Sequence, residues 1–63
     1  MHEDFITITH GMSGFFAVQL TWNTDHEGFW EPLRTGIGRY VDREDAVKEA
    51  KYWAKTEDLE FQT

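Results

Sequence analysis

The clearest pattern of apolar and polar residues lies between Asp42 and Glu57 and predicts an amphipathic helix. At about 100° per residue, one arc of this segment is apolar and the opposite arc is charged. Asp42 is a favourable N-cap, and Asp45 stands at the acidic position of a capping box. The apolar arc comprises Ala46, Val47, Ala50, Trp53 and Ala54, and the charged arc comprises Glu44, Lys48, Lys51 and Lys55.

Two segments before this helix alternate with a period of two, which predicts β-strands. The first is 5–10, where Ile6 and Ile8 alternate with threonines, and a glycine-flanked turn follows at 11–14. The second is 15–23, which has two rows of side chains on opposite faces. We expect the row with the larger apolar residues to face the core. This row is Phe16, Val18, Leu20 and Trp22, and the other row is Phe15, Ala17, Gln19, Thr21 and Asn23.

The chain from 24 to 41 is less regular. The polar residues 24–28 end in glycine and match a hairpin loop. Residues 29–35 predict a third strand, in which Pro32 lacks an N–H and belongs on a sheet edge or at a bulge. Gly36 and Gly38 predict a break, after which 39–41 resume the strand. After the helix, residues 59–62 alternate again and predict a short terminal strand.

These elements predict one α+β domain spanning 1–63: a three- to four-stranded antiparallel sheet with one amphipathic helix packed on one face, in ββ(β)αβ order. The helix leaves the second face uncovered, and Thr7, Thr9, Gln19 and Thr21 indicate that this face is mostly polar. The remaining aromatics have two interpretations. They supplement the edge of a small core, or they form an exposed apolar patch that marks an interface. These aromatics are Phe5, Phe15, Trp30 and Tyr52.

Composition narrows the class of protein. A chain of 63 residues is near the lower limit for a single core, and its 16% aromatic content helps to fill that core. No cysteine is present, which is compatible with a reducing cytoplasm, where we expect the protein. No segment resembles a signal peptide or a membrane span, so no membrane is expected. The net charge of −6 argues against direct nucleic-acid binding and favours a protein partner with a basic surface.

The search for chemistry predicts no catalytic residue, no cofactor and no metal site. Ser13 lacks the spacing of a nucleophile elbow. The histidines lack the spacing of metal ligands, although Asp25-His26-Glu27, or His2 with Asp4, could touch a cation. The segment 36–39 resembles an anion cradle, but the carboxylates that follow it oppose phosphate binding, and a glycine-shaped bulge is the simpler interpretation. For Arg34 and Arg39 we expect pairing with local acids, with an interface role as the alternative.

Three stretches resemble a pattern found in very small uncharacterised α+β proteins of bacteria and their phages. They are GFWEPL at 28–33, TGIGRY at 35–40 and EAxxWA at 49–54, and together they cover roughly the C-terminal half. The resemblance implies no activity and no site residue. In topology the chain is also similar to small acidic phage proteins that inhibit host machinery by docking on it.

The leading functional hypothesis is a small acidic, non-catalytic protein-binding module that docks on a larger partner or on a second copy of itself. Its expected contact residues combine hot-spot residue types with acids from the first helical turn: Trp30, Phe15, Tyr52, Arg39, Glu44 and Asp45. One alternative is a nucleic-acid mimic that occupies a basic groove, in which Glu44, Asp45, Glu49, Glu57, Asp58 and Glu60 replace phosphates. A further alternative is a small enzyme or ligand-binding protein whose site forms between subunits.

Overall fold

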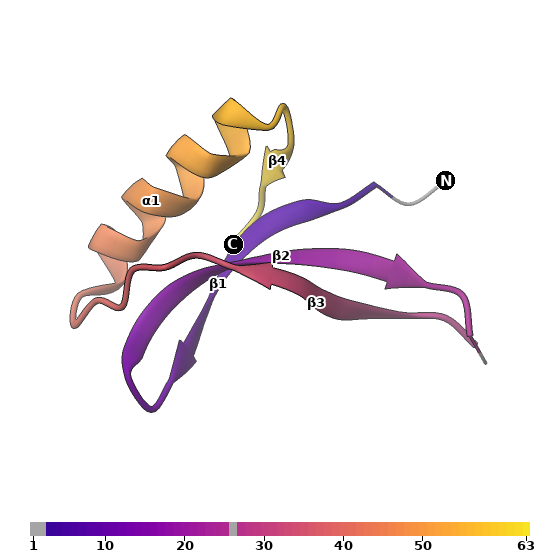
Figure 1. The fold of residues 1–63 in the computed structure, drawn as a ribbon, viewed down its shortest axis with the longest axis horizontal. Helices are drawn as coiled ribbons and strands as arrows, with labels where there is room; N and C mark the ends of the chain where they lie inside the picture. The colour runs from indigo at the N-terminus through magenta and orange to yellow at the C-terminus, as the bar shows by residue number, and fades with distance from the viewer. Residues whose placement is uncertain (1–2, 26) are drawn as a thin grey trace.

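A computed structural model describes residues 3–25 and 27–63. Four strands and one helix follow one another along the chain (Figure 1). Each bound lies within one residue of the sequence-based prediction. The elements are β1 (Phe5–Gly11), β2 (Gly14–Asn23), β3 (Phe29–Thr35), α1 (Arg43–Thr56) and β4 (Glu60–Phe61).

The four strands form one sheet in the order β3-β2-β1-β4. β1 pairs with β2 in antiparallel register, from Phe5 opposite Leu20 to Gly11 opposite Gly14, and β2 pairs with β3 in the same sense. The predicted α+β fold, with a helix packed on a sheet, is confirmed. β4 differs from the predicted antiparallel arrangement because it returns beside β1 and pairs with it in parallel. The sheet is therefore mixed.

The irregular segment between β3 and α1 keeps contact with the sheet. Gly36 N–H donates to the Ala17 carbonyl at 2.8 Å, and Phe15 and Tyr40 exchange two backbone hydrogen bonds of 2.7 and 2.9 Å. The prediction that the strand breaks and then resumes is confirmed. Gly14 makes this approach possible, because its φ is +117° and a Cβ there would overlap the Tyr40 carbonyl.

Pro32 occupies the position that its chemistry allows. β3 is an edge strand, and a bulge shifts the β2–β3 register between Gln19 and Leu20. Gln19 lies opposite Arg34 and Leu20 lies opposite Pro32, so Leu33 is the extra residue. An edge strand with a bulge tolerates the missing N–H, as predicted.

The two ends of the helix differ in their capping hydrogen bonds. Asp42 is the N-cap residue, but its side chain makes no capping hydrogen bond. At the other end Asp58 adopts φ +57°, and Leu59 N–H donates to the Ala54 carbonyl at 2.8 Å. This six-to-one bond around a left-handed residue is the Schellman arrangement, in which glycine is the usual occupant. The chain can therefore reverse into β4.

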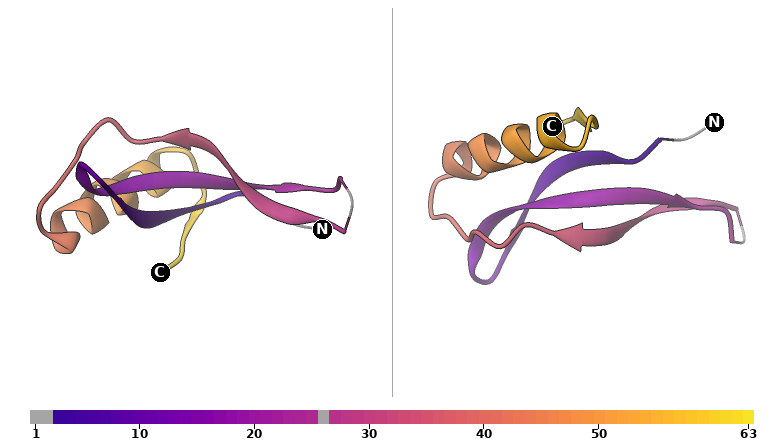
Figure 2. Two further views of the ribbon diagram at one scale, coloured as in Figure 1. Left: turned by 90° about the horizontal axis from the view of Figure 1, so that it is seen from below. Right: turned by 45° about the horizontal axis from the view of Figure 1, so that its top comes forward.

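The helix covers the opposite face of the sheet from the one predicted. α1 lies on one side of the sheet, and the β2–β3 hairpin extends beyond it (Figure 2). The core beneath the helix contains Ile6 and Ala17 with Ala50 and Ala54. In β2 these contacts belong to the row of Ala17 and Gln19. The expectation that Phe16, Val18, Leu20 and Trp22 face the helix is therefore wrong, and this larger apolar row lies on the uncovered face.

The core is thin. Among the described residues, six apolar ones are buried, and four of these are alanines: Ile6, Ala17, Val18, Ala46, Ala50 and Ala54. Small side chains let α1 approach the sheet closely, but they remove little apolar area from water. The radius of gyration is 11.8 Å, whereas a compact chain of this length gives about 10.6 Å. The molecule is correspondingly extended, measuring 35 × 26 × 17 Å.

Candidate functional site

The face of the sheet opposite α1, here called the open face, carries the larger apolar row of β2. Register pairing assigns its members, because residues directly opposite one another in neighbouring strands point to the same side. No charged side chain belongs to this set within the described strands β1 to β3. The set is Phe5, Thr7 and Thr9 from β1, Phe16, Val18, Leu20 and Trp22 from β2, and Trp30, Pro32 and Thr35 from β3.

Three aromatic rings gather at one end of the open face. The centroids of Phe5 and Trp30 lie 4.7 Å apart, those of Trp22 and Trp30 lie 5.2 Å apart, and both pairs meet edge to face. Gly28 supports this cluster, since its φ is +89° and an added Cβ would lie 2.5 Å from the Trp22 ring. Trp30 still exposes 37% of its surface. The cluster therefore has a fixed geometry and an accessible indole.

The middle of the open face is hollowed. A shallow cavity of about 340 Å³ lies between Thr7 and Thr9 of β1, Val18 and Leu20 of β2, and Pro32 of β3. Its walls are hydrocarbon and threonine side chains, without an ionisable group. Such a wall can make apolar contacts and neutral hydrogen bonds, but it cannot donate or accept a proton at neutral pH.

Two charged side chains of the described residues lie at the margins of the open face. The Arg39 guanidinium lies 4.2 Å from the centroid of the Phe16 ring, and its Nη1 donates to the Gly36 and Gly38 carbonyls at 2.7 and 3.0 Å. Arg39 thus pairs with backbone and with an aromatic ring, and no bond to an acid, the expected partner, occurs among the described residues. Glu60 of β4 lies at the other end of the open face. It stands opposite Phe5 in the β1–β4 register, so both residues belong to the same face of the sheet.

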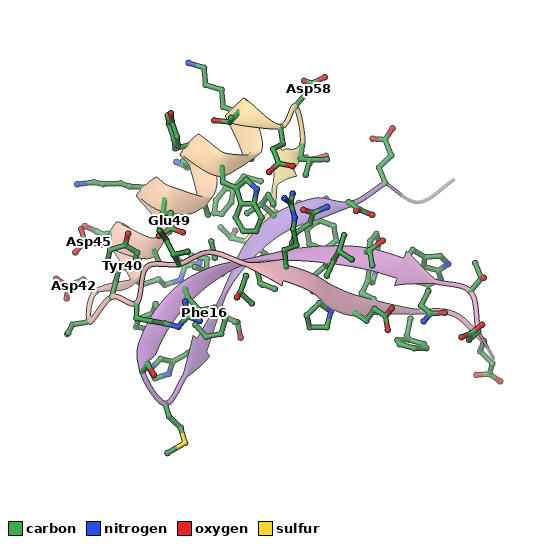
Figure 3. All side chains as sticks on the ribbon, viewed as in Figure 1. Phe16, Tyr40, Asp42, Asp45, Glu49 and Asp58 are labelled. Atoms are coloured by element: carbon green, nitrogen blue, oxygen red, sulfur yellow. The ribbon has the colours of Figure 1, made fainter. Side chains whose placement is uncertain are left out.

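A second hollow, of about 390 Å³, lies on the other side of the molecule between α1 and the loop before it. Its residues are Ile37, Tyr40, Glu49, Tyr52, Trp53 and Thr56. Tyr40 and Glu49 point toward one another there, and Phe16 lies on the other side of the loop (Figure 3). The Tyr40 hydroxyl donates to Glu49 Oε1 at 2.7 Å, and this bond is the main reason why the pKa of Tyr40 is raised. Tyr40 is consequently a poor acid.

The glycines before the helix surround a carboxylate of the chain itself. A Cβ added at Gly36 or Gly38 would overlap the Glu49 carboxylate, and at Gly38 it would also overlap the Tyr40 hydroxyl. At Gly38 the Tyr40 ring adds to the overlap, so this position favours glycine, whereas at Gly36 only the flexible end of Glu49 has to move. This packing also agrees with the interpretation of 36–39 as a glycine-shaped backbone, because the space that an external anion would need is filled by Glu49.

A polar network joins β3 to the helix on the covered face. Gln19, only 6% exposed, donates to Asp4 at 2.7 Å and accepts two hydrogen bonds from Arg34, at 2.6 and 3.0 Å. Arg34 also forms an ion pair with Glu57, which confirms the expectation that Arg34 pairs with an acid. Trp53 Nε1 donates to the other Glu57 oxygen at 2.6 Å. The bonds from Arg34 and then Trp53 lower the pKa of Glu57.

The residues predicted to contact a partner do not form one site. Trp30 and Arg39 belong to the open face and its margin. Phe15 is half-buried on the helix side and stacks on His10 with 4.4 Å between centroids. Tyr52 is 74% exposed on α1, and Glu44 and Asp45 lie in the first turn of α1. The analysis of the sequence missed Leu20 and Trp22 as residues of the uncovered face, because their strand row was assigned to the core. Phe5 had been named as a candidate for an exposed apolar patch.

The six acids named for nucleic-acid mimicry also lie in different parts of the molecule. Glu49 and Glu57 are bonded within the chain. Asp45 lies beside the first turn of α1 and Asp58 beyond its last turn, as Figure 3 shows. They therefore do not form a continuous row of free carboxylates.

Metal-binding chemistry finds little support in the described part of the chain. No group of three or more histidine, cysteine, aspartate or glutamate side chains that could hold a metal ion occurs among residues 3–25 and 27–63. His2 and His26, named above as possible cation contacts, lie outside the described residues.

Within the described residues, the single helix, α1, is too short and too polar to cross a membrane. Comparisons of the chain with protein-family models, with curated proteins and with solved structures find no match.

Proposed function

We propose that this chain is a non-catalytic protein-binding module that docks through the open face onto an apolar, uncharged protein surface. The observation that carries the proposal is the position of the large apolar residues of β2. Phe16, Leu20 and Trp22 are not covered by the helix, although the core beneath it is built mainly of alanines. Contiguous apolar surface on a small protein commonly marks an interaction site.

The residue types of the open face support a protein ligand. Tryptophan and phenylalanine are enriched at binding hot spots, and charged residues are depleted at the centres of interfaces. The aromatic cluster at one end offers rigid anchors, and the neighbouring hollow of about 340 Å³ offers a recess for a partner side chain. The lack of cysteine fits a reducing compartment such as the cytoplasm.

The chemistry of both hollows favours binding over catalysis. The open-face hollow has no ionisable wall, so a site formed there between two subunits would lack an acid or a base. In the other hollow, the raised pKa of Tyr40 opposes proton transfer at neutral pH, and Glu49 already accepts the Tyr40 hydroxyl. Nucleic-acid mimicry receives less support, since Glu49 and Glu57 are bonded within the chain.

Affinity capture with three variants tests this function. Leu20→Lys places a charge in the centre of the open face, while Tyr52→Lys places the same charge on the exposed side of α1. We expect the wild-type chain and Tyr52→Lys to retain the same protein, whether another protein or an untagged copy, and Leu20→Lys to lose it. Leu20→Thr, which keeps a strand-forming residue, should weaken retention. Docking through the open face would be refuted if Leu20→Lys retained the captured protein as well as the wild type does. It would also be refuted if Tyr52→Lys alone lost that protein.

A further inference from the structure

We infer that the occupant of the open face is a second copy of this chain, so that two sheets pack face to face with one helix on each outer side. This inference rests on the proposed function, because it names the partner of the same surface. Three observations favour a second copy over an unrelated protein: the shortage of core, the excess of exposed area and the distribution of charge.

The first observation is the shortage of core. In the described part of the chain, four of the six buried apolar residues are alanines, and Ile6 is the one large side chain that is fully buried. A single core in a chain of this length rarely supplies more than modest stability, and small proteins often add disulfides, a structural metal or oligomerisation. The chain has no cysteine, and the described residues contain no cluster that could hold a metal. A second copy is the partner that is present whenever the chain is made, so it can supply the missing burial at all times.

The second observation is the amount of exposed surface. The chain exposes 4722 Å², which is about 470 Å² more than a typical monomeric protein of this mass exposes. Covering this excess on two copies would remove roughly 900 Å² from water, close to the ~1,000 Å² that a specific interface requires. The other side of β1 and β2 is already covered by α1. Sheets that pack face to face are a common architecture. The excess of the whole chain is thus close to the area that a small dimer buries.

The third observation is the distribution of charge. A net charge of −6 would oppose self-association if the acids lay on the contacting surface. The residues that β1, β2 and β3 contribute to the open face are all uncharged. Two described residues of opposite charge lie at opposite ends of its margins: Arg39 beside Phe16 and Glu60 opposite Phe5. Opposite charges at opposite ends are self-complementary, because a twofold rotation can place Arg39 of each copy near Glu60 of the other copy.

Sedimentation equilibrium of the purified full chain tests the inference. We expect the wild-type chain to sediment at twice its 7.5 kDa mass, Tyr52→Lys to do the same, and Leu20→Lys to sediment at 7.5 kDa. A wild-type chain that stays at 7.5 kDa up to millimolar concentration would overturn the inference. A dimer that Leu20→Lys leaves intact would overturn it as well, because the contact would then lie elsewhere.

A second measurement keeps the test decisive if Leu20→Lys fails to fold. The denaturation midpoint of the wild-type chain should rise with protein concentration, because dissociation accompanies the unfolding of a dimer. A midpoint independent of concentration would contradict the second copy. The failure of this inference can be told apart from the failure of the proposed function. If the chain is a monomer but still captures another protein in a Leu20-dependent manner, the proposed function holds and only the identity of the partner changes.

Discussion

The ring of Trp30 meets the ring of Phe5 edge on, with 4.7 Å between their centroids, across the strand that separates β3 from β1. The contact ties the first strand of the chain to the edge of the sheet on the face that the helix leaves uncovered. It also holds a partly exposed indole in one position. A rigid aromatic is a better anchor for binding than a mobile one, because less conformational entropy is lost when the partner docks.

A double-mutant cycle measures this contact. We expect Phe5→Leu and Trp30→Leu to show a coupling of about 0.5–1.5 kcal/mol in the free energy of unfolding, beyond the loss of buried area. Chemical denaturation of the four proteins at one protein concentration provides the measurement. Phe5→Leu with Tyr52→Leu is the matched control, and these two changes should be additive. Additive effects for Phe5 and Trp30 would contradict the edge-to-face contact.

Gln19 holds the polar network of the covered face together. Replacing Gln19 by Leu should reduce the free energy of unfolding by about 1–3 kcal/mol, because Arg34 and Asp4 lose their partner and the site is almost completely buried. Thermal and chemical denaturation measure the change. The same substitution at the exposed Gln62 should change stability by no more than about 0.5 kcal/mol. Equal effects at the two glutamines would show that the network contributes nothing.

The stability contributed by Glu57 should depend on pH. Hydrogen bonds from Arg34 and Trp53 lower the pKa of Glu57 in the folded chain, so the folded state binds fewer protons than the unfolded state near the ordinary value of 4.5. This contribution is therefore complete above that value and is lost as the pH falls through the folded pKa. The difference in unfolding free energy between the wild type and Glu57→Gln should narrow as the pH is lowered from 6 to 3.

Arg34→Met supplies the control for this pH series. Without the guanidinium, the main cause of the lowered pKa is gone, so Glu57→Gln in this background should show a much flatter pH dependence. A difference between wild type and Glu57→Gln that stays constant across the series would show that the ion pair is not formed in solution.

Asp58 is a position where substitution should stabilise the chain. Its φ of +57° is unfavourable for a side chain with a Cβ, and its negative charge lies beside the negative end of the helix dipole. We expect Asp58→Gly to raise the free energy of unfolding by about 1 kcal/mol, and Asp58→Ala to raise it less or to lower it. Denaturation midpoints distinguish these outcomes. A destabilised Asp58→Gly would mean that α1 does not end in the left-handed turn.

Local patterns predicted the elements of this fold well. The three- to four-residue spacing from Ala46 to Ala54, the alternation in β1 and β2, and the glycines before α1 all reflect backbone preferences that operate within a few residues. Pro32 was correctly expected on an edge or at a bulge for the same reason. The bounds agree to within one residue because turn residues and glycines mark most of the boundaries between the elements.

The face covered by α1 did not follow from local pattern. Both rows of β2 contain apolar residues, and the row with larger side chains was the natural expectation for the core. The actual choice depends on the crossover from β3 over α1 to β4, which joins two parallel strands of one sheet. Such crossovers are almost always right-handed. Had β4 been placed in parallel beside β1, this rule would have limited α1 to one face of the sheet.

The partner-contact residues were predicted only in part, for the same reason. Trp30 and Arg39 belong to the open face or its margin, but Leu20 and Trp22 had been assigned to the core along with the rest of their row. Residue type alone could not separate a core tryptophan from a surface one. The position of each row relative to the helix decides this, and it is a property of the whole chain.

The most direct test of the account is the set of nuclear Overhauser contacts made by the alanine methyl groups of α1 in solution. The account predicts contacts from Ala50 and Ala54 to Ile6 and Ala17, with none to Leu20 or Trp22 of the same chain. Contacts from these alanines to Leu20 and Trp22 would place the helix on the other face. The open face would then be the core, and both proposals that depend on it would fail.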